Sequence, residues 1–143
     1  MTIRPLDPAD AEAVERITRL SPEAADWPME SYRGLPAWVA ESDGRVLGLL
    51  VARIAADEME ILNLAVEPAS RRRGAGTALV DAAVEHGRRT GAARVFLEVR
   101  ESNLVAQRFY ERRGFAVTGR RLRYYRQPEE DALLMAREVA PAP

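Results

Sequence analysis

The stretch that decides the fold of this chain is I-L-N-L-A-V-E-P-A-S-R-R-R-G-A-G-T, from Ile61 to Thr77. It begins as an apolar run typical of a buried strand, breaks at Glu67-Pro68 and ends in a basic turn with two glycines, after which a helical pattern starts. At such a junction the free N–H groups of the first helical turn and the positive end of the helix dipole converge on one point. That point suits a phosphate group.

The glycines of this turn strengthen the prediction of an anion site. Gly74 and Gly76 leave room for a ligand against the backbone, and they can take the positive φ that turns successive N–H groups inward. Arg71, Arg72 and Arg73 add positive charge beside them. Without further support, a solvated basic turn is an equal alternative.

Two other glycine-rich phosphate motifs do not fit. A P-loop needs Lys and then Ser or Thr after its last glycine, whereas Gly76 is followed by Thr77 and Ala78. The dinucleotide fingerprint needs Gly or Ala where this chain has Leu79, and its acidic ribose ligand near the end of the next strand. Glu98 lies at a suitable distance but in the middle of a predicted strand. The pattern that remains is R-x-x-G-x-G.

The composition restricts the class of protein. We expect one domain, residues 1–143, because this length suits a single core and no linker or repeat divides the chain. A net charge of −1 argues against a general nucleic-acid binder, and the absence of cysteine excludes disulfides, thiolate metal sites and a cysteine nucleophile. With one histidine, His86, we predict no metal site. No apolar signal core or membrane-length window is present, so we predict a cytoplasmic protein without a membrane partner.

The order of predicted elements indicates an α+β fold. Asp7 and Pro8 mark a helix start, Asp43-Gly44 marks a hairpin turn, and the strand after the glycine turn is reached through a helix and should be parallel to the strand before it. We therefore predict a mixed, mostly antiparallel sheet with one parallel crossover and helices on both faces. The predicted strands are 2–6, 37–42, 45–54, 59–66, 94–101, 116–125 and 131–138, and the predicted helices are 7–20, a short turn within 21–35, a helix after Gly76 to about 91, and 103–113.

Five collinear segments resemble one enzyme superfamily. R-x-x-G-x-G is similar to the pyrophosphate-binding signature of the GNAT acetyltransferases. Four more segments resemble one branch of it, the bacterial ribosomal-protein-alanine N-acetyltransferases, and together the five cover about half of the chain: N-L-A-V-E-P (63–68), L-E-V-R-E-S-N (97–103), F-Y-E-R-R-G-F (109–115), and R-R-L-R-Y-Y with E-D-A-L-L-M (within 120–135).

The resemblance implies acetyl-coenzyme A as the acetyl donor. In the family, the backbone of the strand that matches Leu64, Ala65 and Val66 pairs with the pantetheine arm between two splayed parallel strands. The segment that matches Arg72, Arg73, Gly74, Ala75, Gly76 and Thr77 holds the pyrophosphate, and Asn103 matches a further cofactor contact. A diphosphate gains charge-assisted bonds from several N–H groups, and an amide-bearing arm needs unpaired strand backbone.

The resemblance also implies the catalytic residues. Glu98 matches the general base, acting directly or through a water, and Tyr110 matches the general acid that protonates the departing thiolate. The alternative for Glu98 is an ion pair with Arg100 on the same face of the strand, and for Tyr110 a half-buried helix aromatic. No nucleophilic residue is required, because direct attack in a ternary complex suffices.

The acceptor implied by this branch is a protein N-terminus, with the N-terminal alanine of a small-subunit ribosomal protein as the expected partner. The family's peptide surface matches the loop with Trp27 and Tyr32 and the terminal hairpin with Tyr124 and Tyr125. Trp27-Pro28 reverses the branch's usual order, which puts the fine specificity in doubt, and the two loop aromatics could instead cap the core. A lysine or small-molecule amine acceptor, or an acetyl-coenzyme A-binding module without turnover, are the alternatives.

Overall fold

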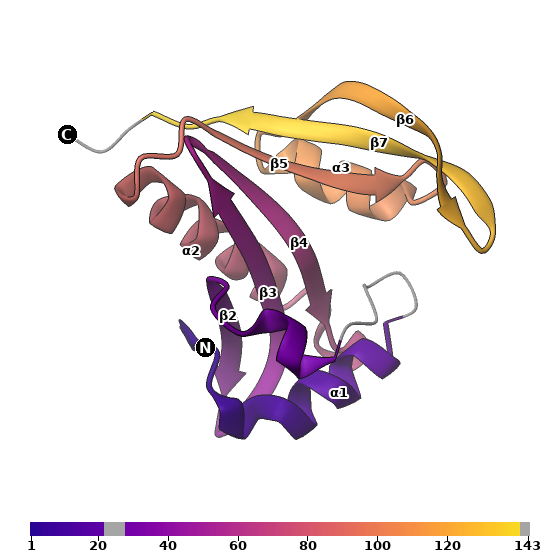
Figure 1. Ribbon diagram of the computed structural model, residues 1–143. Helices are drawn as coiled ribbons and strands as arrows, with labels where there is room; N and C mark the ends of the chain where they lie inside the picture. The colour runs from indigo at the N-terminus through magenta and orange to yellow at the C-terminus, as the bar shows by residue number, and fades with distance from the viewer. Residues whose placement is uncertain (22–27, 141–143) are drawn as a thin grey trace.

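The computed structural model describes residues 1–21 and 28–140 (Figure 1). The order of helices and strands is the predicted one, and the α+β class is confirmed. The elements are β1 (Thr2–Pro5), the 3-10 turn η1 (Pro8–Asp10), α1 (Ala11–Arg19), η2 (Met29–Tyr32), β2 (Ala37–Ser42), β3 (Arg45–Ala55), β4 (Glu58–Val66), η3 (Pro68–Ser70), α2 (Ala75–Arg89), β5 (Arg94–Arg100), α3 (Leu104–Arg112), β6 (Ala116–Arg126) and β7 (Glu129–Glu138).

The strands form one seven-stranded sheet in the order β1-β2-β3-β4-β5-β7-β6. In it β4 and β5 run parallel, as predicted, and the other neighbouring pairs are antiparallel. Asp43 and Gly44 both have positive φ, 52° and 77°, which is the geometry of the predicted two-residue hairpin turn between β2 and β3.

The parallel pair comes apart after a short contact. The β4–β5 ladder holds three residue pairs and ends at Glu60–Phe96. The register between β3 and β4 shifts by one residue at this point. Val51 and Ala52 of β3 lie opposite Asn63 and Ile61 of β4, so Leu62 of β4 is an extra, bulged residue. A bulge bends its strand, and Figure 1 shows β4 and β5 diverging beyond their contact. The β5-facing backbone of β4 from residue 61 to 66 therefore lies outside the ladder, at a gap in the sheet.

Alternate residues of the central strands serve two separate cores. Leu50 and Ala52 pack in a cluster with α2, whereas Leu49 and Val51 pack in a cluster with Ile17 of α1. Since successive side chains of a strand point to opposite faces, α1 and α2 cover opposite faces of the sheet, as predicted. Within the described residues, no helix combines the length and apolar character needed to cross a membrane.

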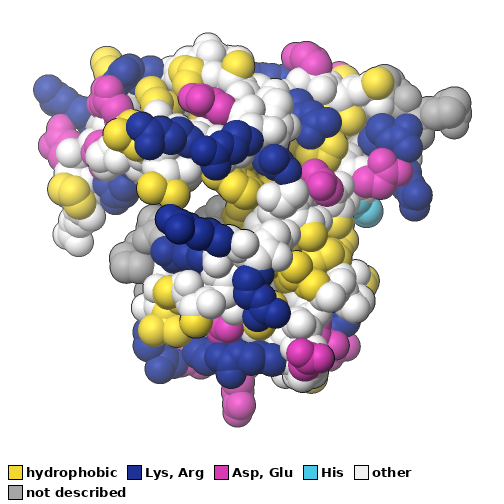
Figure 2. Space-filling view, turned by 180° about the vertical axis from the view of Figure 1, so that it is seen from behind, with side chains coloured by type: hydrophobic (Ala, Val, Ile, Leu, Met, Phe, Trp, Pro, Cys, Tyr) yellow, Lys and Arg dark blue, Asp and Glu magenta, His cyan; other side chains and the backbone are white. Residues whose placement is uncertain are grey.

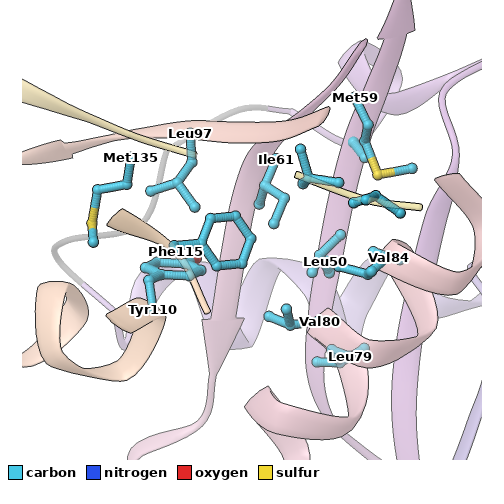
Figure 3. Packing of buried hydrophobic residues seen from close by; sticks show 14 of the residues in the cluster. Leu50, Met59, Ile61, Leu79, Val80, Val84, Leu97, Tyr110, Phe115 and Met135 are labelled. Atoms are coloured by element: carbon cyan, nitrogen blue, oxygen red, sulfur yellow. The ribbon is translucent and has the colours of Figure 1, made fainter. Parts of the chain in front are cut away.

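The second half of the sheet is covered by α3. Tyr110 of α3 and Phe115, just after it, pack against Leu97 of β5 and Met135 of β7, and Figure 3 shows these side chains continuing the core that α2 covers. The α2 and α3 helices thus share one face of the sheet and lie on either side of the gap between β4 and β5. This arrangement brings the first turn of α2 toward α3.

Candidate active site

The turn between β4 and α2 has the geometry of an anion site. Gly74 lies just before α2 with φ 86°, and no side chain of the described part of the chain caps this helix start. Arg72, in the same turn, also has a positive φ of 71°. The helix begins at Ala75, slightly earlier than predicted. Its first N–H groups are left for another partner, which is what a bound pyrophosphate requires.

Gly76 serves this site in a different way from the one predicted. It is not among the positive-φ glycines of the described residues, because it already belongs to the helix. A Cβ at this position would lie 3.3 Å from Cζ of Phe109 on α3 and 3.9 Å from Cγ2 of Val66. Gly76 therefore permits the close approach of α2, α3 and the end of β4, rather than a turn.

The predicted cofactor-binding residues lie in three places: on β4, in the turn and helix start that follow it, and, for Asn103 alone, just before α3. Leu64, Ala65 and Val66 lie on β4 where its β5-facing backbone has left the ladder, and the segment 72–77 lies directly after it. Figure 2 shows a hollow in the surface at this gap, with arginine side chains on both of its margins. Asn103 is the outlier, because its side chain caps α3 by accepting a bond from the N–H of Ala106 at 3.1 Å.

Charge and unpaired backbone in this hollow match the chemistry of acetyl-coenzyme A. A diphosphate carries negative charge and many acceptor oxygens, and the pantetheine arm carries amides that can bond to a free strand edge. The predicted roles of these residues toward the cofactor remain predictions.

Glu98 lies on β5, two residues beyond the last β4–β5 pair and on the face opposite to α3. Its carboxylate is 9% exposed and lies 3.0 Å from Nε of Arg121, which reaches across β7 from β6. The alternative ion pair with Arg100 is wrong, because Arg100 instead pairs with Glu130 at 3.2 Å. Glu98 is thus a carboxylate at the gap whose partner comes from the terminal hairpin.

An irregular segment of β6 brings that partner into place. Leu122 to Tyr124 stand opposite the single residue Asp131 of β7, and Arg123 has a positive φ of 52°. Asp131 holds this conformation by accepting the N–H of Arg123 at 2.8 Å and the guanidinium of Arg120 at 2.9 Å. The apolar and charged pattern of β6 gave no sign of this irregularity, and Arg121 was not among the predicted site residues.

The two predicted acceptor-binding tyrosines of the hairpin lie beside Glu98. A hydrogen bond to Glu98 raises the pKa of the Tyr124 hydroxyl, and burial, followed by the charge of Glu98, raises the pKa of Tyr125 to about 12. Their ring centroids are 5.1 Å apart, and the guanidinium of Arg100 lies 4.2 Å from the Tyr125 ring centroid. Together they form an aromatic wall next to the carboxylate.

Tyr110 lies on the other side of β5 from Glu98. Its ring is buried and makes edge contacts with Phe109 and Phe115, with centroids 5.1 Å and 5.4 Å away (Figure 3). Burial raises the pKa of its hydroxyl above the ordinary value. The structure therefore places the two predicted proton-transfer groups on opposite faces of the same strand, and the role of Tyr110 as an acid stays a prediction.

The remaining predicted acceptor residues lie elsewhere. Tyr32 is buried in the core beneath α1, and its hydroxyl accepts a bond from Nδ2 of Asn63 at 3.1 Å, which fits the alternative that it caps the core. Trp27 lies outside the described residues. Among the described residues, no three His, Cys, Asp or Glu side chains are grouped as a metal site.

A comparison with known families adds to this geometry. The model of the acetyltransferase (GNAT) family matches residues 7–115. The chain belongs to the GNAT acetyltransferases. It is therefore an acetyl-coenzyme A-dependent N-acetyltransferase, as predicted.

Individual GNAT relatives match over most of the chain. The ribosomal protein bS18-alanine N-acetyltransferase of Escherichia coli K12 is 33% identical over 100 residues, with 68% of each chain covered. An uncharacterised N-acetyltransferase of Methanocaldococcus jannaschii is 35% identical over 147 residues, with 96% of this chain and 92% of that one covered. The crystal structure of the ribosomal-protein-S18-alanine N-acetyltransferase from E. coli has a TM-score of 0.86 at 29% identity, covering 99% of this chain and 96% of its own.

Proposed function

We propose that this GNAT enzyme acetylates the N-terminal α-amino group of a protein, and that the acceptor is the N-terminal alanine of a small-subunit ribosomal protein. The E. coli relative that is 33% identical carries this activity in its name. A ribosomal acceptor would make the cytoplasm its place of action.

The observation that carries the proposal is the position of Glu98. Its carboxylate lies beside the gap between β4 and β5, and the hairpin residues Arg121, Tyr124 and Tyr125 surround it. An extended N-terminus that enters along the hairpin would place its amine at the carboxylate, while the opposite side of the gap takes the cofactor.

The chemistry requires two proton movements. Bound acetyl-coenzyme A supplies a thioester carbonyl for the amine nitrogen to attack and a thiolate as the leaving group. Glu98 accepts the proton that the amine loses, directly or through a water, and Tyr110 donates a proton to the thiolate sulfur. Tyr110 can fill the donor role because a tyrosine hydroxyl, with an ordinary pKa near 10, carries a proton at neutral pH.

An α-amine suits a single carboxylate base better than a lysine does. The α-amino pKa is near 8, so about a tenth of the groups are neutral at pH 7, whereas a lysine amine with a pKa near 10.4 is neutral roughly 300-fold less often. With an N-terminal acceptor, a much larger fraction of the amine is therefore already neutral and can attack without prior removal of a proton.

A competition assay tests the proposal. The enzyme and acetyl-coenzyme A are offered equal amounts of an Ala-starting peptide, the same peptide with a blocked N-terminus and a free internal lysine, and a polyamine, and the products are quantified by mass spectrometry. Because the enzyme contains no lysine, acetylation of its own lysines cannot confuse the result. We expect the Ala-starting peptide to react fastest.

Other outcomes point to the alternatives. Faster acetylation of the lysine peptide or the polyamine would replace the N-terminal acceptor by a lysine or a small-molecule amine. Binding of coenzyme A without acetylation of any amine would indicate a module without turnover.

A further inference from the structure

A second glutamate, Glu67, accepts four side-chain hydrogen bonds beside the cofactor turn. Its carboxylate, 6% exposed, accepts from Arg45 through Nε at 3.3 Å and Nη2 at 2.9 Å, and from Oγ of Ser70 at 2.7 Å. Nη2 of Arg16 lies 3.5 Å away. These partners, Arg45 first, hold the pKa of Glu67 below its usual value, so the carboxylate is ionised at neutral pH.

The partners of Glu67 come from three separate parts of the fold. Arg16 belongs to α1, and it also donates to the carbonyl of Val46 at 2.7 Å. Arg45 begins β3, and Ser70 ends η3 in the turn itself. Glu67 is the first residue after β4, so it joins the start of the turn to both the sheet and the helix on its other face.

Beyond Ser70 the turn is anchored by Arg71, whose N–H donates to the carbonyl of Pro68 at 3.3 Å and whose Nε donates to the carbonyl of Val66 at 3.4 Å. Residues 71 to 74 are all exposed, and α2 begins at Ala75. Because α2 is itself fixed by side chains that are buried from Ala75 onward, the course of the exposed residues 71 to 74 into that helix depends on where the turn starts. A side chain that fixes the beginning of the turn would therefore preorganise the anion site before a ligand binds.

We propose that Glu67 is a positioning residue for the cofactor: it holds the segment 72–77 in the geometry that binds the pyrophosphate, without touching the ligand itself. This inference rests on the proposed cofactor site at the start of α2.

The chain supplies a matched control in Asp10. Its side chain is 8% exposed and accepts from Nη1 and Nη2 of Arg4, each at 2.9 Å, and from the N–H of Asp7 at 2.8 Å. Asp10 joins β1 and β2 through Arg4, which also bonds Glu41. It is thus a buried, arginine-bonded carboxylate like Glu67, but none of these partners belongs to the cofactor turn.

The test compares Glu67→Gln with Asp10→Asn in the full chain. Coenzyme A binding is measured by calorimetry, and kcat and KM for acetyl-coenzyme A are measured with an Ala-starting peptide. We expect Glu67→Gln to weaken coenzyme A binding and raise KM about tenfold while kcat stays within about twofold, since a misplaced site loses binding rather than chemistry. We expect both Glu67→Gln and Asp10→Asn to lower the melting temperature by a few degrees, but Asp10→Asn should change neither the affinity for coenzyme A nor the KM for acetyl-coenzyme A.

The outcomes separate the inference from the proposed function. If the wild type binds no coenzyme A, the cofactor site itself is wrong. If the wild type binds it and Glu67→Gln binds equally well, or if Asp10→Asn raises KM as much, the positioning role is overturned. Should Glu67→Gln fail to fold, Arg45→Gln removes one partner of Glu67 from a more exposed position, and an unchanged KM there would refute the inference.

Discussion

Two glutamates with arginine partners, Glu67 and Glu98, stand at the two ends of the proposed site, and their surroundings differ in one respect. Glu67 is bonded by three residues from separate elements: Arg45, through two nitrogens, Ser70 and Arg16. Glu98 is bonded by Arg121 and by Tyr124, which both lie at the irregular segment of β6. The exposure of the main arginine partner is nearly the same in the two cases, at 58% for Arg45 and 55% for Arg121. Burial of the two carboxylates is nearly the same, at 6% and 9% exposure.

The difference shows how to separate a carboxylate that supports the fold from one that is available for chemistry. Glu67 accepts bonds from Arg45, Ser70 and Arg16 at once, so a ligand would have to displace several partners together. Glu98 has one arginine partner, Arg121, and an exposed pair of this kind contributes only about 0–1 kcal/mol. The amine of an acceptor can therefore take the place of Arg121 at Glu98 more readily than a ligand could displace Arg45 and Ser70 together from Glu67.

The largest expected effect is on turnover. Glu98→Gln keeps the size of the side chain but removes its ability to take a proton, and we expect kcat to fall about 10²-fold or more with coenzyme A binding intact. Glu60→Gln is the control, because Glu60 is also paired with an arginine, Arg53, and lies at the end of the β4–β5 ladder. Steady-state kinetics with an Ala-starting peptide measure both. Turnover close to that of the wild type in Glu98→Gln would make Glu98 structural.

The next effect concerns cofactor affinity. Gly76→Asp places a carboxylate in the first turn of α2, where the pyrophosphate would lie, and we expect coenzyme A affinity to fall at least about tenfold through like-charge repulsion. Gly76→Ala meets the same Phe109 ring at 3.3 Å without the charge, so it separates the steric part of the loss. Calorimetry on both folded variants decides the matter. Equal affinities in the two would mean that no anion binds there.

The sequence was informative where local chemistry controls the structure. The Asp43-Gly44 turn, the break at Glu67-Pro68 and the helix after the glycine turn could be predicted because hairpin turns and helix starts depend on a few neighbouring residues, although the helix begins at Ala75 rather than after Gly76. The order of the elements along the chain followed from them, whereas the position of β7 between β5 and β6 was not predicted. The candidate roles of Glu98 and Tyr110 came from a family resemblance, since a charged residue on a strand has no local signature of catalysis.

Features that depend on distant partners could not be predicted. An ion pair with Arg100 was the alternative for Glu98 because both lie on one face of a strand. Residues two apart on a strand are nearly 7 Å from each other, and Arg121 approaches Glu98 from another strand instead. The bulged Leu62 sits within a continuous apolar run, so nothing in the pattern marks it. Glu67 appeared only as part of a turn, because its partners lie 22 and 51 residues away.

A smaller effect is expected from the exchangeable partner of Glu98. Arg121→Gln removes the group with which an acceptor amine competes, so we expect the KM for an Ala-starting peptide to fall by up to about fivefold, in line with the free energy of an exposed ion pair. Arg123→Gln is the control, because Arg123 pairs with Glu129 at 3.2 Å instead. A lower kcat with unchanged KM in Arg121→Gln would show that the arginine assists the base rather than competing for it.

The smallest effect is a pH dependence of stability that belongs to Glu67. Its folded-state pKa is lowered by Arg45 and Ser70, so its contribution is fully present above the unfolded pKa of about 4.3 and is lost as pH falls through the folded value. At pH 7 we expect the free energy of unfolding of Glu67→Gln to be about 1.5–3 kcal/mol lower than that of the wild type, the usual size for lost bonds to a charged group. Denaturant unfolding between pH 7 and pH 3 should show this difference shrink below about pH 4, because the protonated wild-type side chain then resembles Gln. Glu98→Gln, in which one arginine contact and one tyrosine bond are lost instead of four bonds, should show a smaller difference at pH 7. If the difference in the free energy of unfolding between the wild type and Glu67→Gln did not change with pH, then packing, and not the charge of Glu67, would hold the turn in place.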